Sequence, residues 1–341
     1  MSTTAHDVNG TKAPAYTLTE EDKDHFLKYG YVKIESCFTP EKAAQWTNDV
    51  WIRLGYSPTD KSTWTKERIN MPHHRSEPVS TFAPKAWDAI CELVGGEDRI
   101  SEDEEFRSWR DSLIVNLGTD EWEEQFKQGS EMDPKELDNW HVDGDFFWHF
   151  LDSPEQALLV IPLFSDIKPH GGGTMICPEG IARIARHLYN HPEGVSPFMT
   201  PRREAPESGP EKPTLSAFTG LIQQCNEFHE MTGNIGDVIL LHPFMLHSAS
   251  RNCLREPRII TNPPVGLKKP FNFDREDERK YSLVERKTLL ALGRERLRGW
   301  RVVGKRERIV PERMKVFSEM KKEEEARLRR AEEGRATVDG A

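Results

Sequence analysis

Apolar residues recur at helical spacing in the first third of the chain, interrupted by short polar turns. Thr19 can cap the first helix, and Gly30 stands just past its end. A second helix begins with Pro40 at its first position, and its apolar residues recur every three or four positions. The pattern predicts, in order, a helix over residues 20–29, a strand over 31–34, a helix over 40–54, a loop over 56–85 and a helix over 85–93.

In the middle of the chain, short apolar runs separated by turn residues replace the helical spacing. Such runs are typical of an antiparallel sandwich or barrel. The predicted strands cover residues 113–117, 157–164, 174–177, 220–224, 238–241 and 258–264. An amphipathic helix over 181–189 lies between them, followed by a proline-rich insert at 197–213. Inserts of this kind are often lids or substrate loops, and a solvated surface excursion is the equal alternative.

From Lys280 onward the chain is predicted to be helical and highly charged. Residues 312–333 alternate blocks of both signs. The favoured interpretation is a solvated helix with salt-bridged faces, and a partner-binding tail is the alternative.

Composition narrows the class of protein. The 341 residues carry 47 basic and 57 acidic side chains, a formal net charge of −10, which disfavours a general nucleic-acid role because phosphates would be repelled. Five scattered cysteines without a CxxC pair indicate free thiols in a reducing compartment. The sequence shows neither a secretory signal pattern nor a run of about 20 apolar residues. We therefore expect a cytoplasmic protein with no membrane partner.

The most informative pattern is His141-Val142-Asp143, followed much later by His247 and then by Arg258. On an extended segment, side chains two residues apart point to the same side, so His141 and Asp143 can reach one metal. Two imidazoles and one carboxylate can hold one face of a ferrous ion and leave its other positions open. A buried arginine needs an anion, and its planar fork suits a carboxylate.

These residues carry a family resemblance. From Leu18 to about Val265 the chain resembles the phytanoyl-CoA dioxygenase-like group of iron(II)- and 2-oxoglutarate-dependent oxygenases. The segments that carry the resemblance are residues 18–32, the glycines 171–173 with Thr174 and Pro178, and, most specifically, residues 236–258. The resemblance implies a mainly β fold with flanking helices, whose core is a double-stranded β-helix of the jelly-roll or cupin type. It also implies Fe(II), 2-oxoglutarate and O2, with His141, Asp143 and His247 as catalytic iron ligands and Arg258 holding the far carboxylate of 2-oxoglutarate.

The chain departs from the family pattern at two places. The hydroxyl residue expected second after the distal histidine is absent, since Ser248 is followed by Ala249. Thr174 or Asn116 is therefore the candidate for that cosubstrate contact. The usual Pro-Gly-Ser-His after the central strand is replaced by residues 178–181, Pro-Glu-Gly-Ile. No phytanoyl-CoA substrate site is recognisable, so that substrate is not expected here.

Composition and the resemblance together divide the chain into a disordered N-terminus over residues 1–16, an oxygenase domain over 17–275 and a charged helical extension over 276–341. The oxygenase domain includes the N-terminal helices and an insert at 190–215. The oligomeric state is left open.

Two alternatives exist within the motif. His242 could replace His247, but the two lie five residues apart on what the pattern predicts to be one strand, and so on opposite faces. Asp145 could replace Asp143, although the spacing favours Asp143. A carboxylate at this position also disfavours halogenation, because related halogenases carry a small residue there.

Polar and aromatic residues near the motif have two interpretations. Packing is favoured over a pocket wall for Trp148 and His149. An exposed loop is favoured over a substrate role for Arg68, Asn70, His73, His74 and Arg75.

The predicted function is oxidation of a C–H bond in a small molecule, such as an amino acid or a secondary-metabolite intermediate. Hydroxylation, desaturation and oxidative cyclisation are all open. The alternatives are a cupin-type metal-dependent oxygenase or isomerase that does not use 2-oxoglutarate, and a non-catalytic metal-binding scaffold protein.

Overall fold

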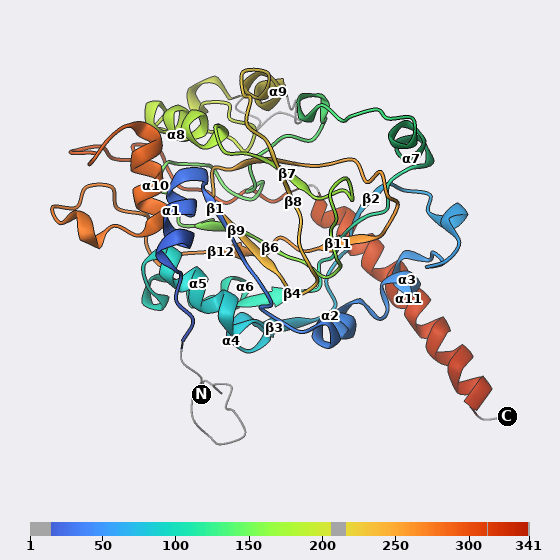
Figure 1. Cartoon of the computed structure of the whole chain (residues 1–341). Coiled ribbons are helices and arrows are strands. Elements are labelled where there is room, and N and C mark those ends of the chain that lie inside the picture. Colours follow the sequence, from blue (N-terminus) through green and yellow to red (C-terminus); the bar gives the residue numbers. More distant parts are fainter. Residues whose placement is uncertain (1–14, 206–215, 312, 340–341) are drawn as a thin grey trace.

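The computed structural model describes residues 15–205, 216–311 and 313–339, so most of the predicted disordered N-terminus lies outside the described residues. Antiparallel sheets occupy the middle of the molecule and helices surround them (Figure 1). No helix in the described parts of the chain is both long enough and apolar enough to cross a membrane.

The largest sheet has four antiparallel strands. Their order is β1 (Tyr31–Ile34), β9 (Val238–Leu241), β6 (Leu158–Pro162) and β12 (Pro264–Val265). Every residue of β6 and β9 is buried, which explains why their sequences are continuous apolar runs rather than alternating ones.

Two three-stranded sheets and a two-stranded pair complete the β structure. They are β10 (Leu246–Ala249), β7 (Thr174–Cys177) and β8 (His229–Met231); β11 (Arg258–Ile260), β5 (Ile114–Asn116) and β2 (Arg68–Asn70); and β3 (Ser76–Pro78) with β4 (Ser108–Arg110). Arg258 and Arg68 both pair with Asn116, from the two sides of β5. Residues paired across strands share a face, so both arginines project from the same face of this sheet.

Helices cover the sheets. They are α1 (Glu20–Tyr29), α2 (Pro40–Thr47), α3 (Val50–Leu54), α4 (Val79–Phe82), α5 (Pro84–Val94), α6 (Glu104–Arg107), α7 (Asp120–Lys127), α8 (Gly180–Asn190), α9 (Ser216–Ile222), α10 (Leu283–Leu292) and α11 (Arg313–Asp339). Short 3-10 helices cover Lys61–Thr63, Glu97–Arg99, Pro134–Glu136, Arg202–Glu204 and Glu278–Lys280. The first helix begins and ends as predicted, with a capping box between Thr19 and Asp22 and a left-handed Gly30 at its C-terminus.

Residues 56–85 are not one loop, since they contain β2, β3 and α4, and residues 293–311 are not helical, since a left-handed Gly293 ends α10. Three further predicted helices and strands need correction. Residues 220–224 are not a strand, because Phe218 and Ile222 lie four apart and bury one face of α9. The helix predicted over 40–54 divides into α2 and α3 at Asn48 and Asp49, both poor helix formers. The predicted strand 258–264 divides into β11 and β12, because Pro263 has no backbone N–H to donate.

The charged C-terminal helix is not solvated on all sides, contrary to the favoured prediction. α11 lies along α3 (Figure 1), and Glu324 is buried there. The Arg53 guanidinium, fully buried on α3, donates to Glu324 Oε2 at 2.9 Å, to Asp111 Oδ2 at 2.9 Å and to the Pro72 carbonyl at 2.6 Å. His74 Nε2 lies 2.8 Å from the same Glu324 oxygen. One buried guanidinium thus joins three distant parts of the sequence.

Breaking this network should destabilise the fold. Glu324→Ala leaves the buried Arg53 charge with one carboxylate fewer, and we expect a loss of about 3 kcal/mol in the free energy of unfolding. The matched control is Glu323→Ala on the same helix, because Glu323 is exposed and pairs only loosely with Arg327. Its cost should stay below about 0.5 kcal/mol. Urea unfolding of both variants measures the difference, and equal costs would contradict a buried anchor.

Candidate metal centre

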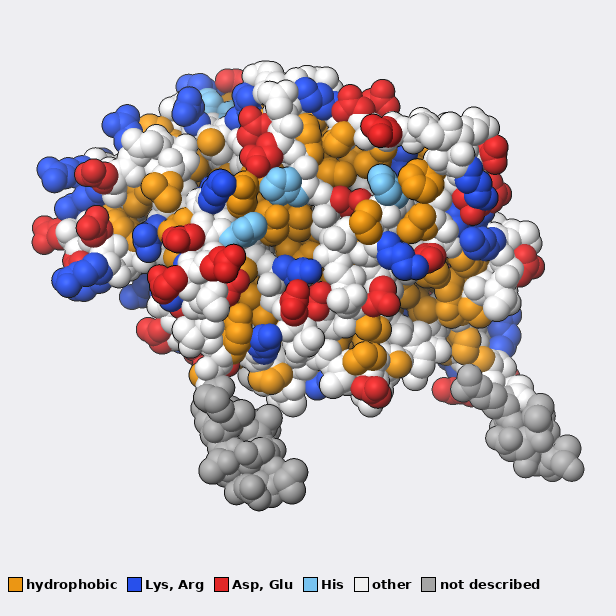
Figure 2. Space-filling view, viewed as in Figure 1, with side chains coloured by type: hydrophobic (Ala, Val, Ile, Leu, Met, Phe, Trp, Pro, Cys, Tyr) orange, Lys and Arg blue, Asp and Glu red, His pale blue; other side chains and the backbone are white. Residues whose placement is uncertain are grey.

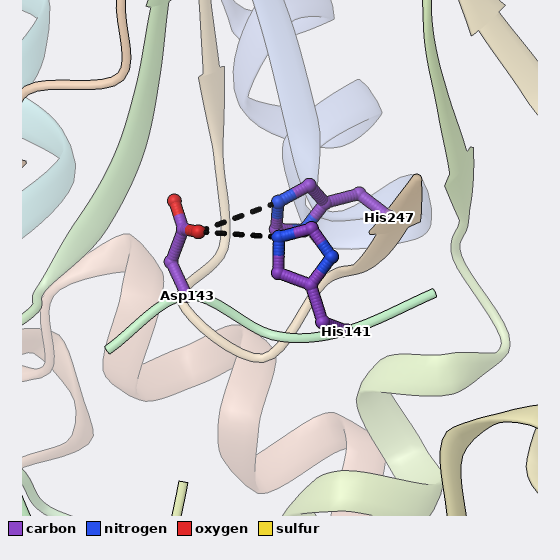
Figure 3. A group of neighbouring side chains, drawn as sticks. All are labelled: His141, Asp143 and His247. Carbon is purple, nitrogen blue, oxygen red and sulfur yellow. Dashed lines mark ion pairs between the residues drawn. The ribbon is translucent and has the colours of Figure 1, made fainter. Parts of the chain in front are cut away.

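Three side chains predicted as ligands converge on one point (Figure 3). Asp143 Oδ1 lies 3.5 Å from His141 Nε2 and 3.6 Å from His247 Nε2. His247 comes from β10. His141 lies on an extended segment that pairs with it, through two backbone hydrogen bonds of 3.0 Å between these two residues. This pairing places the two imidazoles side by side, with ring centroids 4.2 Å apart.

The outer nitrogens of both rings are occupied by backbone carbonyls. Nδ1 of His141 donates to the Asn139 carbonyl at 2.6 Å, and Nδ1 of His247 donates to the Met245 carbonyl at 3.0 Å. With the proton on Nδ1, each neutral ring presents the lone pair of Nε2 toward Asp143. Such carbonyl partners are the usual way in which a protein orients a metal-ligating histidine. The donor set of two imidazole nitrogens and one carboxylate oxygen therefore fits Fe(II).

The electrostatics of the three groups also favour a cation. Burial acts to raise the pKa of Asp143, but His141 and His247, which donate to it from Nε2 when they are protonated, lower it below its ordinary value. Burial acts to lower the pKa of His141, but Asp143 outweighs it and the pKa is raised. The carboxylate is held ionised, and a positive charge beside it is favoured. Asn262 Nδ2 donates to the other oxygen, Asp143 Oδ2, at 3.3 Å.

The three side chains line a cavity of about 630 Å³. Its apolar wall comes mainly from strands and consists of Ile114, Leu159, Ile161, Ala249 and Ile260, together with Val142. Its polar lining beyond the three side chains is Arg68, Asn70, Asp138, Asn139, Asp145, Thr174, Arg258, Asn262 and Arg313. A reactant can therefore approach the candidate metal centre along a partly apolar, partly polar passage.

Arg258 lies on the wall of the same cavity and is 2% exposed. Its Nε donates to the Gly172 carbonyl at 2.8 Å and its Nη1 to the Ile114 carbonyl at 3.4 Å. Among the described residues, no carboxylate forms an ion pair with it. Burial, and then repulsion from Arg68, lowers the pKa of Arg258 to about 10. A buried guanidinium without a counter-ion is a site prepared for an anion.

The structure separates the two candidates for a hydroxyl-type contact. Thr174 is buried and lines the cavity. Asn116 is buried too, but it is not on the cavity wall. Its Nδ2 donates to the Ser250 carbonyl at 3.0 Å, and its Oδ1 accepts from the Gly118 N–H at 3.1 Å. The expectation that Asn116 contacts a cosubstrate has no support, because its amide is already bonded to the backbone.

The alternatives within the motif have other partners. His242 does not share a strand with His247, contrary to the prediction, because β9 ends at Leu241 and a turn follows. His242 is fully buried, and its Nε2 lies 2.9 Å from Thr288 Oγ1, so it is a core histidine. Asp145 stands on the cavity wall in an ion pair with Arg313 from the start of α11.

The polar group at 68–75 divides between two places. Arg68 and Asn70, on β2, line the cavity, so the exposed-loop interpretation is wrong for them. His74 instead turns to the buried Arg53 network. Sequence reasoning also missed Asn262 and Arg313 as cavity residues, because both come from segments whose position depends on tertiary packing.

Comparisons with known proteins give weak similarities only. No family model matches the chain, and no curated protein matches its sequence. HygX from Streptomyces hygroscopicus, solved with nickel, 2-oxoglutarate and hygromycin B bound, is 12% identical over 76% of this chain and 90% of its own, with a TM-score of 0.37. EctD from S. alaskensis with bound iron is 17% identical over 76% and 82%, with a TM-score of 0.38. SnoK, a non-heme alpha-ketoglutarate-dependent carbocyclase of nogalamycin biosynthesis, is 14% identical over 73% and 84%, with a TM-score of 0.37. These scores are too low to assign a fold or an activity to this chain.

Substitution should separate the ligands from their neighbours. His247→Gln should weaken Fe(II) binding by at least about 100-fold, since it replaces an imidazole ligand by a poorer one. His242→Gln should lower stability and leave Fe(II) affinity unchanged. Asp143→Asn should lose Fe(II), and Asp145→Asn should keep it. Anaerobic competition with a chelating dye measures all four, and loss of iron in the His242 or Asp145 variant would contradict the assignment.

Proposed function

We propose that this chain is an Fe(II)- and 2-oxoglutarate-dependent oxygenase, of the phytanoyl-CoA dioxygenase-like kind, that oxidises a C–H bond of a small molecule. The observation that carries the proposal is the buried, unpaired Arg258 on the wall of the cavity that also holds the His141, Asp143 and His247 side chains. A metal site alone fits many enzymes. A metal site with an anion-binding guanidinium in the same cavity fits a carboxylate-bearing cosubstrate.

Each residue has a defined role in this proposal. His141, Asp143 and His247 would hold the iron beside the cavity. Arg258 binds the far carboxylate of 2-oxoglutarate through its free guanidinium edge, and the Thr174 hydroxyl supplies a second contact. When bound, iron, 2-oxoglutarate and O2 supply the oxidising chemistry, with 2-oxoglutarate converted to succinate and CO2.

The apolar wall supports the same chemistry. Ile114 and Ile260 pair across β5 and β11 and share a face, and Leu159 and Ile161 share a face of β6. Together they form most of the apolar wall of the cavity that Arg258 and the metal ligands share. We propose that the antiparallel sheets form a double-stranded β-helix, supported by the bridges between Leu163 and Ile260 and between His141 and His247.

The substrate is proposed to be a small polar molecule that binds at the outer part of the cavity, beside Arg68, Asn70 and Asn262. Halogenation is disfavoured, because a halide would need the ligand position that the Asp143 carboxylate fills. A nucleic-acid substrate is disfavoured by the net charge of −10. On the face drawn in Figure 2, basic and acidic side chains are interspersed rather than gathered into one basic area.

Arg258 provides the sharpest test of the cosubstrate. Arg258→Gln removes the charge and should weaken 2-oxoglutarate binding by at least about 100-fold. Arg258→Lys keeps the charge but loses the planar pair of N–H donors, so its affinity should lie between those of the unaltered protein and Arg258→Gln. Titration of the visible charge-transfer band of the anaerobic Fe(II) protein measures the affinity. Arg251→Gln is the matched control, because Arg251 packs on Trp122 outside the cavity. Equal affinity in Arg258→Gln and in the unaltered protein would favour a cupin-type enzyme that does not use 2-oxoglutarate.

The activity itself is tested by succinate release. We expect O2-dependent succinate formation that rises when the correct molecule is included in a screen of amino acids, acyl thioesters and polyketide or terpenoid scaffolds. The Asp143→Ala variant is the blank, because it lacks an iron ligand. No band with Fe(II) and 2-oxoglutarate, together with no succinate above the blank, would reject the proposed function.

A further inference from the structure

The loop that carries Asp143 is irregular and has little backbone support of its own. Residues 142–144 belong to no helix or strand, and a turn follows at Asp145 and Phe146. Gly144 has a φ of +114°, and a Cβ there would lie 2.6 Å from Phe147 Cε1 and 2.9 Å from His149 Cε1. A ligand carboxylate on such a loop needs an external contact to fix its direction.

Asn262 contacts the Asp143 carboxylate itself, and His149 holds the backbone of the loop. Its Nε2 donates to the Gly144 carbonyl at 2.7 Å, and the residue is 5% exposed. Its ring stacks on Phe147, with centroids 4.4 Å apart and an interplanar angle of 16°. Burial lowers the pKa of His149 to about 4, so the ring is neutral near pH 7 and its single proton is on Nε2.

The backbone of His149 is held by Val195, in the insert at 190–215. Its N–H donates to the Val195 carbonyl at 2.9 Å, and the Val195 N–H donates back to the His149 carbonyl at 3.0 Å. Val195 is fully buried, and the Arg202 guanidinium lies over the Trp148 ring, 4.2 Å from its centroid. The described part of the insert therefore packs against residues 148–149.

We propose that His149 is a positioning residue for the iron-binding carboxylate. His149 holds the Gly144 carbonyl and so fixes the orientation of the neighbouring Asp143 side chain. The insert around Val195 provides the rigid base for His149. This inference rests on the proposed function, because it takes Asp143 as an iron ligand. It assigns His149 no contact with metal, cosubstrate or substrate.

Three substitutions separate the hydrogen bond from simple packing. His149→Phe keeps an aromatic ring on Phe147 and loses the donor. His149→Gln places an amide N–H near the position of Nε2, and His149→Asn has a donor too short to reach. We expect Fe(II) affinity to fall about 10- to 100-fold in the Phe and Asn variants and to be largely restored in the Gln variant.

His187→Phe is the matched control. His187 is half-buried beside the insert, and its Nε2 also donates to a backbone carbonyl, that of Met199, at 2.8 Å. The substitution removes a histidine-to-carbonyl hydrogen bond that does not involve the loop carrying Asp143. Its metal-free unfolding midpoint should fall about as much as that of His149→Phe, while its Fe(II) affinity should match that of the unaltered protein.

Fe(II) affinity is measured anaerobically by competition with a chelating dye, and stability by thermal unfolding of the metal-free chain. Folded His149→Phe that binds Fe(II) like the unaltered protein would overturn the inference, as would an equal loss of affinity in His187→Phe. Where His149→Phe does not fold, equal Fe(II) affinities of the Gln and Asn variants would overturn it. Absence of Fe(II) binding by the unaltered protein would instead reject the proposed function.

Discussion

The candidate site depends on the pairing of the segment around His141 with β10. Two backbone hydrogen bonds between His141 and His247 bring residues 106 positions apart to adjacent sites, and their Nε2 atoms face the same Asp143 oxygen. Because both Nδ1 atoms are bonded to backbone carbonyls, the rings cannot turn their lone pairs away without losing those bonds. The arrangement is thus prepared for a cation before one binds.

Strand pairing also determines the position of the candidate anion site. Arg258 and Arg68 stand opposite Asn116 on either side of β5, so the register brings two guanidiniums to one face. Arg258 is the buried one, bonded to two backbone carbonyls and to no carboxylate in the described chain. Burying a charge in this way costs free energy that a bound carboxylate would offset. That cost is the physical reason to read Arg258 as a binding residue rather than a structural one.

Much of the candidate site could be predicted from the sequence, because metal and anion binding depend on residue types and on their spacing along the chain. The spacing of His141 and Asp143, and the turn–strand–histidine–arginine order after Gly236, depend on local rules. The role of Asn116 could not be predicted, since the direction of its amide is set by the Ser250 carbonyl from a distant segment. The burial of Glu324 could not be predicted either. In the sequence it is one of many charges on a helix, and only the packing of α11 against α3 brings it to Arg53. The strand predicted at 220–224 was wrong, because a short apolar run is compatible with both helical and strand periodicity. The burial of Phe218 together with Ile222, four residues apart, favours the helix.

The central claim is that one cavity binds a metal through three side chains and a dicarboxylate through Arg258. The most direct measurement is a crystal structure grown anaerobically with Fe(II) and 2-oxoglutarate, with anomalous diffraction data at the iron edge. We expect an iron peak in contact with His141, Asp143 and His247, and a 2-oxoglutarate carboxylate on the guanidinium of Arg258. An iron peak elsewhere, or 2-oxoglutarate bound away from Arg258, would contradict it.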